Sequence, residues 1–251
     1  MEQPLIRLEN VHKSYGENKV LRGVDLSIFK GEITTVIGKS GEGKSVLLKH
    51  IIGLVKPDSG TILFDGQTLF ARKKSERDTL RKKFSYMFQE TALFDSMTVF
   101  DNIALPLLEG TRMKAAEIKQ NVLKRLEQLD ISGIGNKYPG QLSGGMKKRV
   151  ALARALVTDP EIVLFDEPTT GLDPIRKQAV HIMISEYQKR FGFTGVIVSH
   201  EIPDVFAISQ RVAMLNEGKI IFQGTAADLM GSEDPVIQGF ISPQAVGLED
   251  F

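Results

Sequence analysis

A glycine-rich segment near the start of the chain, GKSGEGKS at Gly38–Ser45, fits the pattern G-x-x-x-x-G-K-[ST]. The glycines allow backbone N–H groups to converge on phosphate oxygens, because no Cβ stands in the way. Lys44 can reach the β- and γ-phosphates of a nucleotide, and the Ser45 hydroxyl suits Mg²⁺. A compact apolar run precedes this phosphate loop and a helical pattern follows it, so we interpret the segment as a nucleotide site and not as an ordinary turn.

Two carboxylates follow a second apolar run, IVLF at 162–165. Asp166, at the end of that predicted strand, is placed to hold Mg²⁺ directly or through water. Glu167 could orient and deprotonate an attacking water. Kinases and switches with the same phosphate loop often lack this second acid, so Glu167 points to hydrolysis.

Three further residues could take part, although each is a weak signal by itself. His200 ends the apolar run GVIVS, and ligands gather at the carboxyl ends of strands in α/β sheets. Gln89 could bind a metal and a water, and the ring of Tyr15 could stack on a base. The other histidines have no comparable setting and are interpreted as structural or exposed: His12, His50 and His181.

A second site with the chemistry of an anion-binding loop lies a hundred residues later, in LSGGM at 142–146. Ser143, Gly144 and Gly145 stand at the start of a predicted helix, KKRVALARAL, whose positive end would face an anion. One nucleotide does not obviously need two such loops.

The elements that must position these residues alternate between strands and helices. The first third is rich in strands, with the patterns LIRLENV, VDLSIF, ITTVIG and GTILFDG. From about residue 90 to 156 the pattern is mainly helical, with Ile118, Val122, Leu126 and Leu129 on one face. After Pro160 apolar strands alternate with helices, which predicts a parallel sheet covered by helices.

Composition limits the remaining classes of function. The chain has 251 residues, 32 of them basic and 31 acidic, so it lacks the basic excess usual in nucleic-acid binders. It has no cysteine, which excludes thiol nucleophiles and cysteine-ligated zinc. No apolar run approaches the roughly 18–20 residues needed to span a bilayer. We therefore expect a soluble, cytoplasmic protein that needs a partner to act at a membrane.

Taken together, these residues resemble the nucleotide-binding subunit of ABC transporters, from about Leu5 to Leu229. The resemblance rests on Tyr15, the phosphate loop, Gln89, LSGG, IVLFDE with GLD after it, and His200, in that order. It implies a P-loop NTPase fold of the α/β class. The parallel RecA-like core would carry an N-terminal antiparallel β subdomain and a helical insertion at about 90–156. The ATPase domain would cover 1–230.

The resemblance also assigns roles. Two copies would pack head to tail, so that the phosphate loop of one faces Ser143, Gly144 and Gly145 of the other across a shared ATP. Asp173 would contact the partner, Glu167 would be the general base, and His200 would hold the γ-phosphate. Mg²⁺ would be held by Ser45, Gln89 and Asp166. The expected nucleotide-binding residues are Tyr15, Gly38, Lys39, Ser40, Gly41, Glu42, Gly43, Lys44, Ser45, Val46 and Gln89.

ALFDSMTVFDNIALPL at 92–107, together with YPGQLSGGMKKRVALARAL, resembles the ATPases of Mla-type (Mce-associated) lipid transporters. That likeness implies phospholipid transport and a peripheral position at the cytoplasmic face of the bacterial inner membrane. The implied partners are a permease docking near residues 91–108, an Mce-domain protein and, in some systems, a STAS-domain subunit. The alternatives are a small-solute importer, a soluble ABC ATPase acting on DNA or ribosomes, and a P-loop kinase or switch.

Two features leave alternatives open. Met146 stands where the family commonly has Gln, and it either packs the helix start or weakens closure around ATP. The tail, 231–251, carries Val236, Ile237, Phe240 and Ile241 at helical spacing. It forms either a helix docked on its own domain or a contact with another subunit.

Overall fold

The computed structural model describes residues 3–87 and 92–241. The chain divides into two compact units, of which the first holds residues 1–71 and 196–251 and the second holds residues 72–195. Each unit is described by itself. Gln89, Thr91 and the last ten residues of the tail lie outside the described residues.

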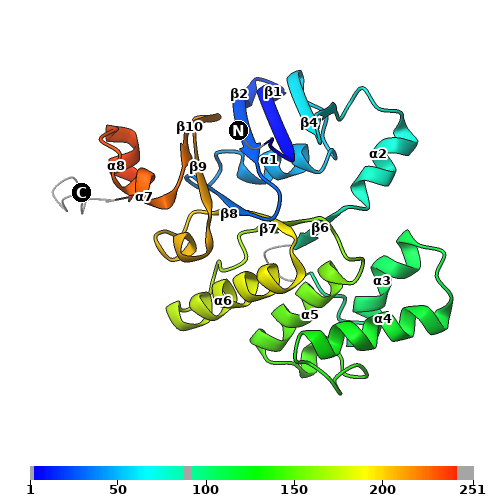
Figure 1. The fold of residues 1–251 in the computed structure, drawn as a ribbon. Helices are drawn as coiled ribbons and strands as arrows, with labels where there is room; N and C mark the ends of the chain where they lie inside the picture. The colour runs from blue at the N-terminus through cyan, green and yellow to red at the C-terminus, as the bar shows by residue number, and fades with distance from the viewer. Residues whose placement is uncertain (1–2, 88–91, 242–251) are drawn as a thin grey trace. The chain divides into compact units, whose positions relative to one another are not determined.

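An antiparallel sheet with the strand order β2-β1-β4-β5 forms one part of the first unit (Figure 1). Its strands are β1 (Ile6–Tyr15), β2 (Asn18–Ile28), β4 (Ser59–Phe64) and β5 (Gln67–Thr68). Ile6, Leu8 and Val11 alternate with more exposed residues along β1 and are buried, as the sequence pattern predicts. This sheet is the predicted antiparallel β subdomain.

The other strands of the first unit carry the phosphate loop. β3 (Ile33–Ile37) is buried at every position and pairs in parallel with β9 (Arg211–Asn216), which pairs antiparallel with β10 (Lys219–Gly224). A strand that is buried on both faces is usually a near-continuous apolar run. ITTVI follows this rule except at Thr34 and Thr35, which are buried as well. Helix α1 (Lys44–Ile51) begins at the end of the loop after β3.

The tail helix packs on its own unit. α8 (Pro235–Ile241) and α7 (Ala226–Met230) follow β10, and Ile237 and Leu229 are buried in one cluster with Val212 and Met214 of β9. Phe240 and Ile241 pack against that cluster. For residues 235–241 this agrees with the prediction of a helix docked on its own domain. A contact of the remaining tail with another subunit stays a prediction.

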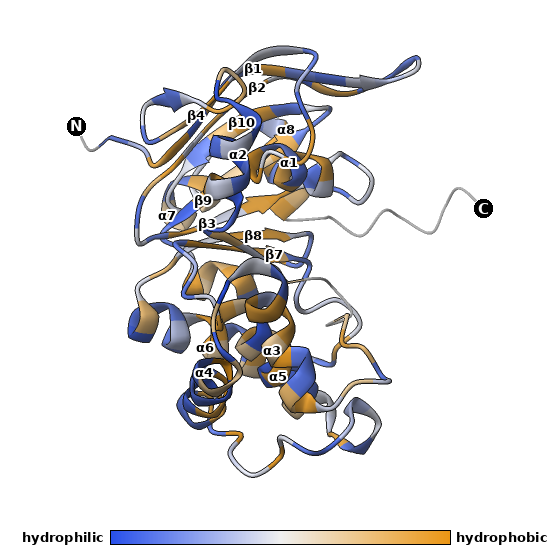
Figure 2. Cartoon of the chain, turned by 90° about the vertical axis from the view of Figure 1, so that its right-hand side faces the viewer, coloured by the Kyte–Doolittle hydropathy of each residue, from blue (hydrophilic) through white to orange (hydrophobic). Residues whose placement is uncertain are grey.

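The second unit joins a parallel strand pair to a group of helices. β6 (Phe84–Met87) pairs in parallel with β7 (Ile162–Asp166), with Tyr86 opposite Leu164. Figure 2 shows β7 in hydrophobic colours, and its first four residues are buried. The helices are α2 (Lys74–Arg81), α3 (Val99–Gly110), α4 (Ala115–Gln128), the short 3-10 helix η1 (Pro139–Gln141), α5 (Gly144–Leu156) and α6 (Pro174–Phe191).

The helical stretch predicted over 90–156 contains α3, α4 and α5, which contact one another. α4 is amphipathic, and the apolar face predicted from Ile118 to Leu129 is buried throughout. Its bounds as a separate subdomain stay a prediction. β8 (Thr194–Ser199) crosses from the second unit into the first, and η2 (Asp204–Ile208) follows it. The α/β class with a P-loop NTPase architecture is confirmed.

Candidate functional site

The phosphate loop depends on glycines for close approach as well as for conformation. A Cβ at Gly38 would stand 2.4 Å from the Leu215 carbonyl oxygen. Gly43, the residue before α1, has a φ of 97°, and a Cβ there would stand 2.6 Å from Cγ1 of Val20. The left-handed conformation directs the loop into α1, whose N-terminal N–H groups favour an anion. The strand–loop–helix order predicted for this segment is confirmed.

Lys44 lies inside the loop that it is expected to serve. Its side chain is almost fully buried, and Nζ donates to the carbonyl oxygens of Gly38 at 2.9 Å and Lys39 at 2.8 Å. A buried ammonium is costly unless its N–H groups are paired, and these two carbonyls supply the pairing. The loop therefore holds a positive charge at its centre, where a polyphosphate would take over these hydrogen bonds.

Tyr15 and His200 also belong to the first unit. Tyr15 ends β1 and is 51% exposed, and the Lys13 ammonium lies 5.4 Å from its ring centroid. An exposed aromatic face at a strand end can stack on a base. His200 follows β8 directly and is exposed. Of the histidines interpreted as structural, His50 and His181 are buried and His12 is half-buried.

A tyrosine holds the carboxylate at the end of β7. The Tyr86 hydroxyl donates to Oδ2 of Asp166 at 2.6 Å. Tyr86 lies opposite Leu164, so Asp166 is its diagonal neighbour on the same face of the parallel pair. Burial, and then the hydrogen bond and charge of Asp166, raise the pKa of the Tyr86 hydroxyl, so it stays a donor at all physiological pH values.

Glu167 has an unusual backbone conformation. Its φ is 49°, in the left-handed region that residues other than glycine seldom adopt. Its Oε2 atom accepts a hydrogen bond from the Thr170 hydroxyl at 3.1 Å. Strained conformations of this kind persist where the surrounding structure fixes them, and they cluster at functional sites. The two acids that are adjacent in sequence therefore have different surroundings.

The LSGGM loop forms the start of α5. Ser143 is the N-cap, and its Oγ accepts from the Met146 backbone N–H at 3.3 Å. Its O–H is still able to donate elsewhere, because a hydroxyl donates and accepts at once. Gly144 and Gly145 are exposed, and Met146 is half-buried.

A hollow of about 410 Å³ adjoins this loop. Ser143, Gly144 and Gly145 line it together with two arginines, Arg149 of α5 and Arg176 of α6. The Lys148 Nζ, also at the hollow, donates to the Pro168 carbonyl oxygen. Cations, a hydroxyl and glycine N–H groups at a helix start are the chemistry of a phosphate site.

Asp173, the predicted partner contact, begins α6. Its Oδ1 accepts from the Arg176 backbone N–H at 3.0 Å, and Oδ2 lies 3.1 Å from Nε of the same arginine. Pro174 occupies the first helical position, where its missing N–H is not needed. Asp173 is thus an N-cap whose backbone and side-chain bonds hold the segment GLDP in place.

A groove of about 370 Å³ lies elsewhere on the second unit, between β6, α3 and α5. Tyr86, Phe94, Leu105, Glu109 and Arg154 are among the residues that line it. Phe94 is 49% exposed, and the Arg154 guanidinium donates to the Ala92 carbonyl oxygen at 2.7 Å. Part of this groove, from Ala92 to Pro106, belongs to the segment 91–108 that is predicted for permease docking.

The docking prediction named five apolar residues, and they differ in burial. Phe94 is exposed, whereas Leu93, Met97 and Phe100 are half-buried. Val99 is fully buried at the start of α3, so its side chain belongs to the core of the second unit and offers no contact surface.

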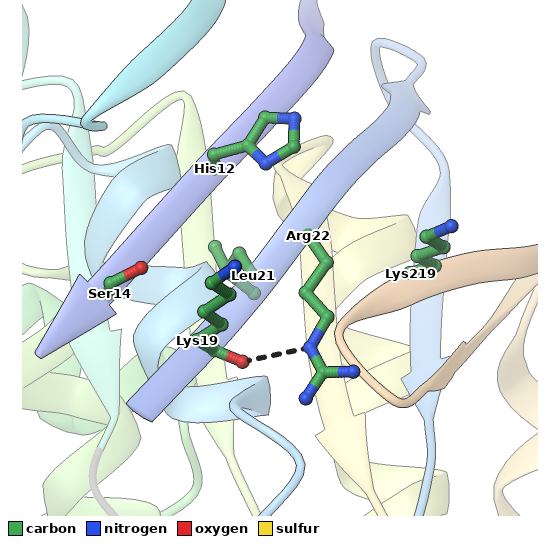
Figure 3. Close-up of a pocket in the computed structure, with 6 residues that line it drawn as sticks. All are labelled: His12, Ser14, Lys19, Leu21, Arg22 and Lys219. Carbon is green, nitrogen blue, oxygen red and sulfur yellow. Dashed lines mark hydrogen bonds between the residues drawn. The ribbon is translucent and has the colours of Figure 1, made fainter. Parts of the chain in front are cut away.

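A further hollow, of about 610 Å³, lies on the first unit outside the predicted site (Figure 3). Its polar lining is mainly basic, with Lys19, Arg22 and Lys219 around it, and Arg22 Nε donates to the Lys19 carbonyl oxygen at 3.2 Å. Ser14, also at this hollow, alternates along β1 with Tyr15, so the two side chains leave opposite faces of the strand.

The predicted residues thus fall into two sets. The phosphate loop, Tyr15 and His200 belong to the first unit; Asp166, Glu167, Asp173 and the LSGG loop belong to the second. The sequence did not indicate Tyr86 or Thr170, because their roles depend on a strand register and on the turn after β7. Within the described residues no group of three or more His, Cys, Asp or Glu is arranged around a metal site, and no helix is long and apolar enough to cross a bilayer.

Comparisons with known proteins agree with this arrangement. Residues 21–170 match the ABC transporter family. The chain is 39% identical to the intermembrane phospholipid transport system ATP-binding protein MlaF of Escherichia coli (strain K12), over 97% of this chain and 90% of the relative. It is 38% identical to the "Probable ribonucleotide transport ATP-binding protein mkl" of Mycobacterium leprae, over 96% of this chain and 70% of the relative.

Two solved structures are also similar. One is CbiO1 of Clostridium perfringens, part of the ABC transporter complex CbiONQ, with a TM-score of 0.84, 30% identity and 95% of each chain covered. The other is a dimeric, post-hydrolysis state of the ATP-binding cassette MJ0796 bound to ADP and Pi. Its TM-score is 0.75 at 32% identity, over 88% of this chain and 98% of that one.

Proposed function

The chain belongs to the ABC transporter family, and from this premise we propose that it is the ATPase of a phospholipid transporter of the Mla type. As a member of that family it is an ATP-binding subunit that hydrolyses ATP. The observation that carries the ATPase part of the proposal is the presence of two loops with the chemistry of an anion site, GKSGEGKS and LSGGM, which the family resemblance implies serve one nucleotide from two chains.

The first unit supplies the nucleotide pocket. Tyr15 stacks on the adenine, the backbone of Gly38–Val46 surrounds the phosphates, and Lys44 exchanges its two carbonyl partners for phosphate oxygens. The Ser45 hydroxyl and the Asp166 carboxylate are hard oxygen donors of the kind that Mg²⁺ prefers, and Gln89 completes the proposed set. Bound Mg²⁺ would neutralise charge on the phosphates.

Glu167 and His200 act on the water and the γ-phosphate. Glu167 orients the attacking water and accepts its proton, and the Thr170 hydroxyl fixes one carboxylate oxygen at 3.1 Å. His200, exposed at the end of β8, donates to the γ-phosphate. These roles, like those of the nucleotide-binding residues, are proposals from the family resemblance.

A second copy of the chain completes the site. The Ser143 hydroxyl, the N–H groups of Gly144 and Gly145 and the positive end of α5 would face the γ-phosphate bound to the partner. The hollow beside Ser143 supports this, because Arg149 and Arg176 line it together with apolar residues and place cations near the helix start. Asp173 would hold the partner through the capped turn GLDP. One two-fold axis then generates two equivalent sites.

Glu167→Gln tests the proposal, because it removes the base and keeps the shape of the side chain. We expect the variant to bind ATP, to turn over below about a hundredth of the native rate and to accumulate as a dimer with ATP and Mg²⁺. Native mass spectrometry with and without ATP measures the dimer. Native turnover, or an ATP-bound monomer, would contradict the assignment.

The permease is proposed to dock in the groove between β6, α3 and α5. The groove is partly apolar, Phe94 stands exposed at it, and Glu109 and Arg154 add charges of both signs. Replacing Phe94 and Met97 with Asp should abolish co-purification with the permease. Leu123→Asp is the matched control, because Leu123 is 51% exposed on α4, outside the segment 91–108. Retained binding with normal coupled ATPase activity would refute docking at this groove.

The cargo proposal rests on relatives. The MlaF proteins of two organisms are 36–39% identical to this chain over nearly its whole length. We therefore include an Mce-domain protein and a STAS-domain subunit as partners, and a peripheral position at the cytoplasmic face of the inner membrane. The mycobacterial relative, named for ribonucleotide transport at 38% identity, gives a second candidate cargo.

Purification of the complex from membranes separates the two cargoes. Mass spectrometry of the bound small molecules should detect phospholipid at about one equivalent or more per complex, and no ribonucleotide beyond that bound to the ATPase. Ribonucleotide in excess of the two ATP sites, without lipid, would favour the second candidate.

A further inference from the structure

Tyr86 lines the groove between β6, α3 and α5, and its side chain is hydrogen-bonded to the predicted metal carboxylate. Its hydroxyl donates to Oδ2 of Asp166 at 2.6 Å, a length typical of a charge-assisted bond. The same residue lines the groove between β6, α3 and α5, near Phe94 and Leu105. A single residue therefore both lines the groove and bonds the carboxylate.

The strand register places Tyr86 and Asp166 on one face. Tyr86 pairs with Leu164 and Met87 with Phe165 in the parallel pair β6–β7, and Leu164 and Phe165 are fully buried. Neither strand can slip without moving a buried side chain to the other face. The register therefore keeps the Tyr86 side chain within reach of the Asp166 carboxylate.

We propose that Tyr86 is a positioning residue that orients the Asp166 carboxylate for its metal and transmits occupancy of the groove to that carboxylate. The inference rests on the proposed function, in which Asp166 holds Mg²⁺ and the groove receives the permease. The hydroxyl acts on Oδ2 and fixes the plane of the carboxylate. Hydrogen bonds to metal-binding carboxylates set their orientation, and their removal typically weakens metal binding or activity by about 10–100-fold.

A partner that enters the groove must contact Tyr86 or its neighbours. A shift of the ring by a fraction of a hydrogen-bond length would lengthen the bond to Asp166, and such bonds weaken steeply with poor geometry. Docking would then alter metal binding without any partner residue at the nucleotide. Tyr86 would act on the metal that Gln89 is also proposed to hold.

Tyr86→Phe removes the hydroxyl and keeps the ring. The probe is Mn²⁺, titrated by electron paramagnetic resonance in the presence of ATP, with Glu167→Gln as the background so that ATP survives. We expect Tyr86→Phe to raise the Mn²⁺ concentration for half-occupancy about tenfold. Tyr187→Phe is the matched control, because Tyr187 is a buried tyrosine in α6 of the same unit, and it should leave the titration unchanged.

The groove is tested with Leu105→Trp, which adds bulk beside Tyr86. This substitution should shift the Mn²⁺ titration severalfold when Tyr86 is present and should have no effect in Tyr86→Phe, since the two residues act through one bond. An equal shift of the Mn²⁺ titration with Tyr86 and with Phe at this position would contradict the proposal that Tyr86 transmits occupancy of the groove. If Tyr86→Phe folds poorly, Leu105→Trp in the Glu167→Gln background still tests the transmission by itself, because an unchanged Mn²⁺ titration there would contradict it.

Asp166→Asn distinguishes a failure of the inference about Tyr86 from a failure of the proposed metal role of Asp166. If Asp166→Asn loses Mn²⁺ and Tyr86→Phe binds it like the parent, the inference about Tyr86 is wrong and the proposed metal site stands. If Asp166→Asn also binds Mn²⁺ like the parent, the proposed role of Asp166 fails, and the inference fails with it. A second readout uses chains that retain Glu167. In these chains we would measure the Mg²⁺ concentration that activates ATP hydrolysis, and the KM for ATP separately.

Discussion

Ser143→Ala should have two effects of very different size, a small loss of folding stability and a large loss of catalytic rate. Ser143 caps α5 through an acceptor contact of 3.3 Å from the Met146 N–H, which is long for such a bond. Loss of an N-cap costs about 0.5–2 kcal/mol, and this contact belongs at the weak end. Against a stability of about 5–15 kcal/mol for a typical domain, that loss leaves essentially every molecule folded.

The catalytic effect is expected to be much larger. If the Ser143 O–H donates to the γ-phosphate in the transition state, its removal should lower kcat by about 10²–10³, the usual effect of losing one preorganised donor. We would measure ATPase turnover at a fixed chain concentration and the free energy of unfolding in urea on the same preparations.

Thr225→Ala is the matched control for the lost cap. The Thr225 hydroxyl caps α7 and accepts from the Asp228 N–H at 3.1 Å, in a segment with no predicted part in the site. We expect a similar loss of stability and native turnover. Turnover of Ser143→Ala within twofold of native would refute the reasoning, because Ser143 would then be a helix cap and nothing more.

Three further predictions concern the signature position, the tail helix and pH. Met146→Gln should leave ATPase turnover of the isolated chain within about twofold, since Met146 is half-buried and we expect it to pack the helix start; a clear rise would favour weakened closure. Ile237→Ala should lower the free energy of unfolding in urea by about 2–5 kcal/mol, because Ile237 is buried against Leu229; a loss below about 0.5 kcal/mol would contradict that docking. Burial lowers the pKa of His50, a shift that its bond with the Val46 carbonyl only partly offsets. The unfolded chain therefore binds more protons, and stability should fall as pH drops below about 6.5, with a flatter slope in His50→Gln.

The sequence indicated the parts of the site that are built locally. The phosphate loop, the strand before it and the helix after it follow one another in the chain, so glycines and apolar spacing were sufficient to predict them. The same holds for the start of α5, where Ser143 is a helix cap of the ordinary kind.

The parts that depend on distant pairing could not be predicted in this way. The bond from Tyr86 to Asp166 joins residues 80 positions apart, and it exists because β6 and β7 pair in one particular register. The left-handed conformation of Glu167 has no signal in the residue type, since glutamate rarely adopts it. Val99 and Phe94 are both apolar in one segment, yet the helix that begins at Val99 buries one and leaves the other exposed.

Tyr86 lines the groove and bonds the carboxylate at the end of β7 within a single unit, so the proposed docking and the proposed metal binding would have a short physical connection. The hollow beside Ser143 belongs to that unit as well. The second unit thus combines proposed contacts to the permease, the metal and the partner's nucleotide.

The central claim is that two chains complete each ATP site, and dilution tests it most directly. Specific ATPase activity should be measured across chain concentrations while mass photometry reports the fraction of dimer at each point. We expect specific activity to fall in parallel with the fraction of dimer, because a group supplied by a partner is worth roughly 10³–10⁵ in rate at phosphoryl-transfer sites. Specific activity that stays constant down to a demonstrated monomer would contradict it.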